Sequence, residues 1–133
     1  MNHKPSVHNE KAKKLMKYIP MGKSAWDVEA KIPKELMPTS GYGNTYARLN
    51  ANEPGMTITR NFACISSSRC IHPYLKRGLT AREAARIQSY PDNYIFKGSK
   101  SDIHLQIGNS VPPLLAEKIA DTIYEMLDEN EKR

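Results

Sequence analysis

The chain has 133 residues and a mean hydropathy of −0.63, enough for one modest domain with little apolar material to spare. Two cysteines argue against a disulfide framework, and the lack of an apolar leader or long hydrophobic run argues against a membrane protein. We therefore expect a cytoplasmic protein with reduced thiols. The spacing of Cys64, Cys70 and His72 fits no common zinc pattern, so we expect no metal site.

Charge is distributed unevenly along the chain. Residues 1–100 hold 17 Lys and Arg against 7 Asp and Glu, whereas residues 101–133 hold 3 against 7. A basic front joined to an acidic rear indicates that only the front meets a polyanion, and nucleic acid is the commonest such partner. A solvated lysine-rich face would explain the same charges equally well.

The first half of the chain predicts little regular structure. Asn9 is placed to cap a first helix whose apolar spacing extends to Ile19, where Pro20 ends it. The stretch that follows is broken by Pro and Gly. The alternating, β-branched residues 56–59 predict a short strand, and residues 61–65 predict either a second strand or an extended loop.

Two helices are predicted in the second half. Thr80 and Glu83 form a capping box for a helix that continues to Gln88. Ser110 is placed to cap a long terminal helix that reaches about Asp128. An exposed apolar face on this helix would let the chain self-associate if it were expressed alone. That face is a stripe at helical spacing, formed by Leu115, Ile119, Ile123, Met126 and Leu127.

Two sequence blocks stand out, RGLTAREAARIQSYPD at 77–92 and QIGNSVPPLLA at 106–116. In this order and at this spacing they resemble the last two conserved motifs of the DNA cytosine-C5 methyltransferase family. The resemblance extends upstream over almost the whole chain. The stretches similar to the family's target-recognition lobe, and to the segment that leads into the two motifs, lie at residues 2–3, 19–22, 26, 46–49, 54–59 and 72–73.

The second block carries the expected cofactor contacts. The resemblance implies that Gly108, Asn109 and Ser110 form a turn beside S-adenosylmethionine, and that the helix after them returns to the large domain of the enzyme. A glycine, an amide and a hydroxyl suit the polar amino-acid end of that cofactor. Local chemistry alone leaves a simpler alternative, in which Ser110 is an ordinary helix cap.

The expected DNA contacts lie upstream of the cofactor contacts. The resemblance implies that Thr59 and Arg60 approach the backbone of duplex DNA near the flipped base, where they would position the duplex without reading its sequence. Arg77 would hold the backbone of the recognition lobe and is a further candidate for a phosphate contact. For Arg60, membership of a solvated basic face is an equally good interpretation.

The residues that perform the chemistry in this family do not occur in the sequence. The family uses a Pro-Cys loop for the nucleophile, a Glu-Asn-Val strand for a carboxylate and a Phe-x-Gly-x-Gly turn for the methyl donor, and none of these is present. Cys64 and Cys70 lie in the recognition segment without a preceding proline, so we assign no catalytic residue. The reaction would therefore need a catalytic chain or an N-terminal segment that carries the nucleophile.

The expected fold is α+β. Residues 1–75 would be a short β-containing remnant of the rear of the DNA target-recognition domain. Residues 76–133 would be helical, and the last helix would complete a doubly wound α/β methyltransferase domain in the full enzyme. The implied function is that of a C-terminal portion or small subunit of a restriction–modification DNA (cytosine-5-)-methyltransferase. A non-catalytic DNA-binding module and an inactive methyltransferase remnant stay open as alternatives.

Overall fold

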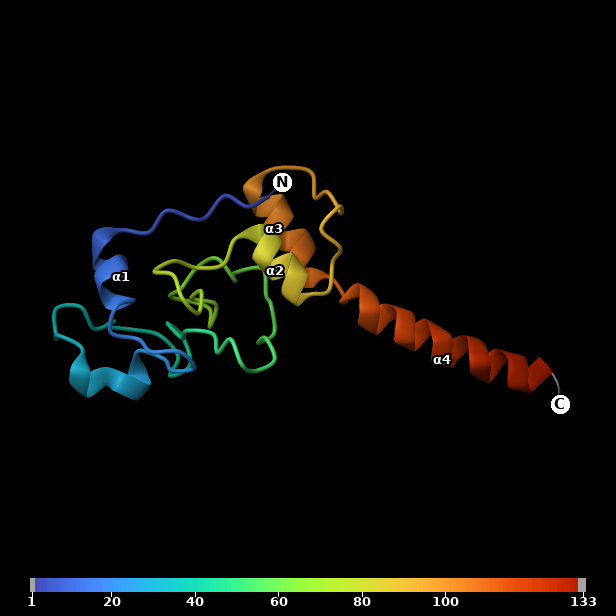
Figure 1. The fold of residues 1–133 in the computed structure, drawn as a ribbon, viewed down its shortest axis with the longest axis horizontal. Coiled ribbons are helices and arrows are strands. Elements are labelled where there is room, and N and C mark those ends of the chain that lie inside the picture. Colours follow the sequence, from blue (N-terminus) through green and yellow to red (C-terminus); the bar gives the residue numbers. More distant parts are fainter. Residues whose placement is uncertain (1, 132–133) are drawn as a thin grey trace.

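The chain is helical and rich in loops, and its last helix extends away from the rest (Figure 1). The computed structural model describes residues 2–131, with side chains described up to residue 129. The helices are α1 (Glu10–Leu15), the 3-10 helix η1 (Trp26–Lys31), α2 (Ala81–Ile87), α3 (Lys100–Asn109) and α4 (Pro113–Glu131). The described residues form no β-strand; three isolated β-bridges join residues 24 and 47, 48 and 71, and 71 and 78.

The predicted strand at 56–59 is therefore wrong, and the β-containing half of the expected α+β fold reduces to isolated bridges. The alternation in its sequence reflects burial on one side, because Ile58 is buried in the core whereas Thr57 and Thr59 are exposed. A strand also needs a neighbouring backbone to pair with, and no bridge of the described residues involves this segment. Residues 61–65, predicted as strand or extended loop, run through consecutive turns.

Helix α1 begins where the sequence predicts and ends early. The Asn9 side chain accepts a hydrogen bond from the Ala12 amide at 2.8 Å and so caps the helix, which confirms the predicted start. The helix ends at Leu15 instead of reaching Ile19. Tighter turn bonds follow, from residue 17 to residue 14 and from residue 18 to residue 15.

Pro20 and Arg48 determine how the carbonyls just after α1 are bonded. An α-helix would supply the N–H of residue 20 to the Met16 carbonyl, but proline has no N–H to donate. The Arg48 guanidinium donates to that carbonyl instead, and its Nε donates to the Ile19 carbonyl at 2.7 Å. An arginine distant in the sequence therefore satisfies two carbonyls that follow the end of α1.

Helix α2 starts with the predicted capping box and an additional cap. The Thr80 hydroxyl accepts from the Glu83 amide at 3.2 Å, and the Glu83 carboxylate accepts from the Thr80 amide at 2.8 Å. The Asn2 carbonyl accepts from the Arg82 amide at 2.9 Å, and His3 Nδ1 lies 2.8 Å from the Thr80 hydroxyl. Because a helix leaves its first N–H groups without partners, the N-terminal residues stabilise α2 directly.

Helix α3 is absent from the sequence-based prediction, which places a turn at 108–110. Ser99 and Asp102 form a second capping box at its start. Gly108 lies within the last turn of α3, and Ser110 is the C-cap of α3 instead of the predicted N-cap of the terminal helix. The Ser110 hydroxyl donates to the Ile107 carbonyl at 2.9 Å, which satisfies an acceptor that the end of the helix leaves open.

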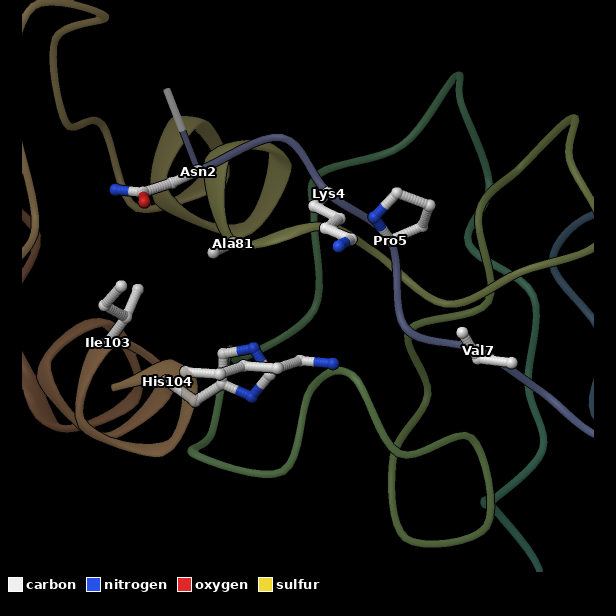
Figure 2. Close-up of a pocket in the computed structure, with 8 residues that line it drawn as sticks. Asn2, Lys4, Pro5, Val7, Ala81, Ile103 and His104 are labelled. Carbon is white, nitrogen blue, oxygen red and sulfur yellow. The ribbon is translucent and has the colours of Figure 1, made fainter. Parts of the chain in front are cut away.

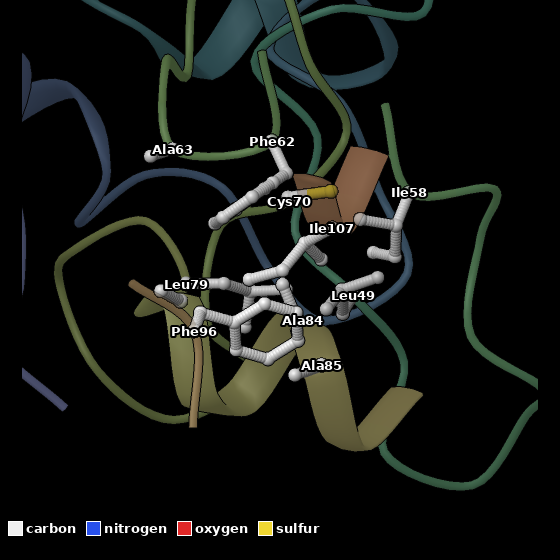
Figure 3. Close-up of a cluster of buried hydrophobic side chains, with 11 residues drawn as sticks. Leu49, Ile58, Phe62, Ala63, Cys70, Leu79, Ala84, Ala85, Phe96 and Ile107 are labelled. Carbon is white, nitrogen blue, oxygen red and sulfur yellow. The ribbon is translucent and has the colours of Figure 1, made fainter. Parts of the chain in front are cut away.

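Two apolar clusters hold the chain together. The first lies between α2, α3 and the loops before them, and Figure 3 shows its side chains converging on Phe62 and Ile107. Its buried members are Leu49, Ile58, Phe62, Ala63, Cys70, Leu79, Ala81, Ala84, Ala85, Phe96 and Ile107. The second lies under α1 and contains Leu15, Met16, Ile19, Ala25, Ile32, Ile65 and Ile71.

Helix α4 has the predicted amphipathic pattern, but its apolar stripe is uncovered. The five stripe residues from Leu115 to Leu127 are between 49% and 60% exposed. The start of the helix is tied to the rest of the chain by the Leu114 amide, which donates to the Ser89 hydroxyl at 3.1 Å. None of the helices in the described part of the chain combines the length and hydrophobicity that a membrane crossing requires.

Candidate functional site

The structure brings the predicted cofactor turn and the predicted DNA segment into contact. Gly108, near the end of α3, packs on the backbone of residues 59 and 60. A β-carbon at Gly108 would overlap the Arg60 amide nitrogen and lie 2.5 Å from the carbonyl carbon of Thr59. Only glycine permits this approach, so the side-chain size at residue 108 is explained by packing. The prediction that Gly108 also lies beside a cofactor stays a prediction.

Asn109 and Ser110 differ in how firmly they are held. The Gln88 amide donates to the Ile107 carbonyl and lies 3.4 Å from the Ser110 hydroxyl, so α2 fixes the end of α3. Asn109 is exposed, and within the described residues its side chain makes no hydrogen bond. Its carboxamide therefore has both a donor and an acceptor available for a ligand.

Thr59 and Arg60 are both exposed and line two different cavities. Thr59 borders a polar cavity that also contains the side chains of Ser67, Ser68 and Arg69. Arg60 borders a second cavity with Lys100 and His104 of α3. The segment is fixed by its core neighbour Ile58 and by a turn in which the Phe62 amide donates to the Thr59 carbonyl at 3.0 Å. Hydroxyls and cations on one rigid segment can hold phosphate oxygens.

Arg77 belongs to a separate cluster around the start of α2. Its guanidinium forms a bidentate pair with the Glu83 carboxylate, with both N–O distances at 2.7 Å, and donates to the Gly78 carbonyl at 3.0 Å. His72 Nε2 lies 3.7 Å from the same carboxylate. The only backbone carbonyl to which Arg77 donates among the described residues is that of its neighbour Gly78, so its expected roles in holding the lobe's backbone and in contacting phosphate stay predictions. Arg86, at the end of α2, pairs with Asp92 at 2.7 Å.

Within this cluster, electrostatics favour the charged state of the Arg77–Glu83 pair. Burial opposes ionisation of Glu83, but hydrogen bonds from Arg77 and Thr80 outweigh it and lower the pKa of the carboxyl to about 2. Burial also lowers the pKa of His72, and the nearby Glu83 carboxylate opposes that shift. Glu83 is therefore a carboxylate at neutral pH that serves both the helix cap and the ion pair.

Arg48 is a key residue that sequence reasoning missed. It is buried, and its guanidinium donates to five carbonyl oxygens, those of Met16, Ile19, His72, Pro73 and Leu75. These acceptors lie 24 to 32 residues away in sequence. In the sequence Arg48 stands between Ala47 and Leu49, and nothing there reveals partners so far along the chain.

The cysteines do not form a reaction centre. Burial raises the pKa of Cys70 to about 11, so its thiol stays protonated at neutral pH. Cys64 is exposed, and a contact of 3.2 Å with the Ser66 hydroxyl lowers its pKa. Among residues 2–131, no group of three or more His, Cys, Asp or Glu side chains is arranged to hold a metal ion.

Comparison with known proteins covers nearly the entire chain. A family model described as C-5 cytosine-specific DNA methylase matches residues 2–125. The chain is 41% identical over 127 residues to the type II methyltransferase M.PspPI of Psychrobacter sp. (strain TA137), a match that covers 92% of this chain. It is 33% identical over 126 residues to the type II methyltransferase M1.HphI of Haemophilus parahaemolyticus, covering 95% of this chain.

These relatives differ in length. The chain spans 30% of M.PspPI and 32% of M1.HphI. A third relative, the type II methyltransferase M.AquIB of Picosynechococcus sp., is 38% identical over an alignment of 100 residues, a match that covers 67% of this chain and 69% of that protein. M.AquIB is therefore similar in length to this chain. The family match from residue 2 to residue 125 shows that the chain belongs to the C-5 cytosine-specific DNA methylase family.

Proposed function

We propose that this chain is the C-terminal portion or small subunit of an S-adenosylmethionine-dependent DNA (cytosine-5-)-methyltransferase of the restriction–modification type. It supplies contacts to the DNA backbone and to the cofactor, but no nucleophile. The observation that carries this proposal is the packing of Gly108 on residues 59 and 60, which joins the cofactor-side turn to the DNA-side segment in one rigid unit.

The proposed division of labour follows the chain. Residues 1–75 form the rear of the target-recognition lobe and present Thr59 and Arg60 to the phosphates of duplex DNA. Residues 76–133 close the cofactor domain, and α4 packs its apolar stripe on the doubly wound α/β sheet of the catalytic part. The exposure of that stripe supports a missing partner surface, because a row of apolar side chains at helical spacing is normally buried.

The cofactor turn fits the ligand chemically. Asn109 offers a donor and an acceptor that the described residues do not use, and Ser110 adds a hydroxyl. These groups suit the amino and carboxylate groups of S-adenosylmethionine, which supplies the transferred methyl group. This chain's residues would hold and orient the polar end of the cofactor, while Thr59 and Arg60 hold the DNA.

The catalytic part is proposed to lie in another polypeptide or in a segment that precedes this one. The absence of Pro-Cys and Glu-Asn-Val from this sequence supports that view. A type II methyltransferase of similar length, M.AquIB, supports the idea that a chain of this size can be a working unit of such an enzyme.

The proposal is tested by reconstitution. The purified chain is mixed with the catalytic part that carries the missing motifs, and transfer of a labelled methyl group to duplex DNA is measured. We expect transfer by the mixture and none by either part alone. Transfer that is equal with and without this chain would contradict the proposal. A mixture that binds DNA tightly without any transfer would favour the inactive remnant, and tight binding by this chain alone would favour the DNA-binding module.

A further inference from the structure

Two neighbouring cavities share a wall on α3. The first, with a volume of about 410 Å³, lies between the N-terminal segment, α2 and α3; Figure 2 shows Lys4 and His104 on opposite sides of it. The second, of about 210 Å³, lies between α3 and the loop after residue 59, and Arg60 borders it. Lys100 and His104 line both cavities, so the two lie next to each other on α3. We call the pair of cavities the α3 groove.

The α3 groove is positively charged and has no acid in its walls. Lys4, Lys100 and Arg60 line it, and no Asp or Glu does. The ion pairs among the described residues involve other cations, those of Lys13, His72, Arg77, Arg86 and Lys118. Among the residues whose side chains are described, no carboxylate therefore forms an ion pair with a cation of the groove. Burial and the Lys100 ammonium both lower the pKa of His104, which fits an uncompensated positive potential.

Lys100 is held in place at the junction of the two cavities. Its ammonium donates to the Ser6 hydroxyl at 2.9 Å, a bond that ties the N-terminal segment to α3. His104 packs against the Phe62 ring with 4.6 Å between ring centroids, so the adjoining wall is anchored in the first apolar cluster. A fixed ammonium loses less side-chain entropy on binding than a free one.

We propose that the α3 groove binds successive phosphates of one strand of the duplex, continuing from Arg60 past Lys100 to Lys4. The inference rests on the proposed function, because it extends the DNA contact assigned to Arg60 along the adjoining wall. Cations spread over two open cavities suit a polyanion, whereas a single small anion would need donors that converge on one point. Such contacts position the duplex and carry no sequence information.

The test measures how the affinity of the assembled enzyme for duplex DNA depends on salt. Each phosphate neutralised contributes about 0.9 to the slope of log affinity against log salt. Lys4→Gln combined with Lys100→Gln should therefore reduce the slope by about two and weaken cognate and unrelated duplexes equally. Lys31→Gln combined with Lys34→Gln removes two exposed lysines outside the groove and should leave the slope unchanged.

Two further variants separate charge from structure. Lys100→Arg keeps the cation and should retain the slope, and Ser6→Ala removes the hydrogen bond to Lys100 while keeping every charge. The double variant Lys4→Gln/Lys100→Gln should unfold at the same temperature as the wild type. If it does and its salt slope is unchanged, the groove proposal is overturned.

The groove and the proposed function fail in different ways. Competition by inorganic phosphate that depends on Lys100, without any change in the DNA slope, would show a small-anion site and would also overturn the groove. Methyl transfer by the wild-type mixture is recorded separately. If the wild-type mixture transfers no methyl group, the proposed function is refuted. If it transfers methyl groups but the Lys4→Gln/Lys100→Gln variant keeps the wild-type salt slope, only the groove is refuted.

Discussion

Gly108 and Arg60 touch through their backbones: no side chain at residue 108 could fit, because its β-carbon would lie 2.5 Å from the Arg60 α-carbon. The end of α3 is thereby fixed against the segment that carries Thr59 and Arg60. A displacement of one element must be transmitted to the other, since packed backbones cannot interpenetrate.

Replacing Gly108 by alanine tests this contact. Alanine favours a helix over glycine by about 1 kcal/mol, but the collision with backbone atoms should cost more, giving a net loss of about 1–3 kcal/mol in the free energy of unfolding. Urea unfolding of the purified chain measures it. Gly43→Ala is the matched control, because a β-carbon there meets nothing within 4 Å. Equal stability of the two variants would show that the contact is not tight.

Arg48→Met should be the most destabilising single change in the chain. The methionine side chain fills similar space but leaves several carbonyls without their charged donor. One of them is the Met16 carbonyl, to which Pro20 cannot donate because it has no N–H. Hydrogen bonds to charged groups contribute about 1.5–3 kcal/mol each when their partner is lost, so we expect a loss of at least about 3 kcal/mol. Arg48→Lys keeps the charge but lacks the planar guanidinium, so it should recover only part of the lost stability, as measured by denaturant unfolding.

Stability should fall in acid through Glu83. Its folded pKa is about 2 against an ordinary 4.5, so the ion pair stabilises the fold above pH 4.5 and this contribution is lost as the pH falls from 4.5 towards 2. The contribution is roughly 2 kcal/mol once screening at this partly exposed group is considered. The stability difference between wild type and Glu83→Gln should therefore shrink between pH 5 and pH 2. A difference that is constant over this range would contradict the assignment.

Asn109→Ala should affect cofactor binding and not folding. The side chain is exposed and makes no hydrogen bond within the described residues, so the free energy of unfolding should change by less than about 0.5 kcal/mol. In the assembled enzyme, loss of one or two hydrogen bonds should raise the Kd for S-adenosylmethionine about tenfold, as measured by calorimetry. Asn93→Ala, another exposed asparagine, is the control. An unchanged Kd would remove Asn109 from the cofactor site.

Helix α4 should be required for assembly with the catalytic part. Ile119→Glu combined with Ile123→Glu places two carboxylates on the apolar stripe, and we expect assembly to weaken by at least about a hundredfold, since each buried aliphatic side chain contributes about 1.5–3 kcal/mol. Sedimentation of the mixed chains measures this. Tyr124→Glu changes an exposed residue outside the stripe and is the control. Assembly that tolerates the double substitution would show that the stripe serves another purpose.

Elements that depend on neighbours in sequence were predictable. The Asn9 cap and the Thr80–Glu83 box involve residues three positions apart, and the stripe of α4 repeats within one helix. Helix α3 could also have been found, because Ser99 and Asp102 have the same capping spacing as Thr80 and Glu83. It was missed because the Gly-Asn-Ser sequence was interpreted as a turn.

Features that depend on distant residues were not predictable. Nothing near Arg48 in the sequence identifies its acceptors, and nothing near residues 56–59 shows that no neighbouring backbone pairs with them. For the candidate site, the family resemblance predicts roles for residues 108–110 and for residues 59–60. Their mutual contact, and the cations of the α3 groove, emerged only when the chain was folded.

The first apolar cluster has a consequence for recombination among relatives. Ile58 and Phe62 on one side of residue 75 share an interior with Ala84 and Ile107 on the other. A crossover at residue 75 would join one side of this cluster from one relative to the other side from a different relative. Side chains that were not matched to each other would then leave voids or overlap. A chimaera of two relatives should therefore fold well only if both sides of this interior come from the same parent.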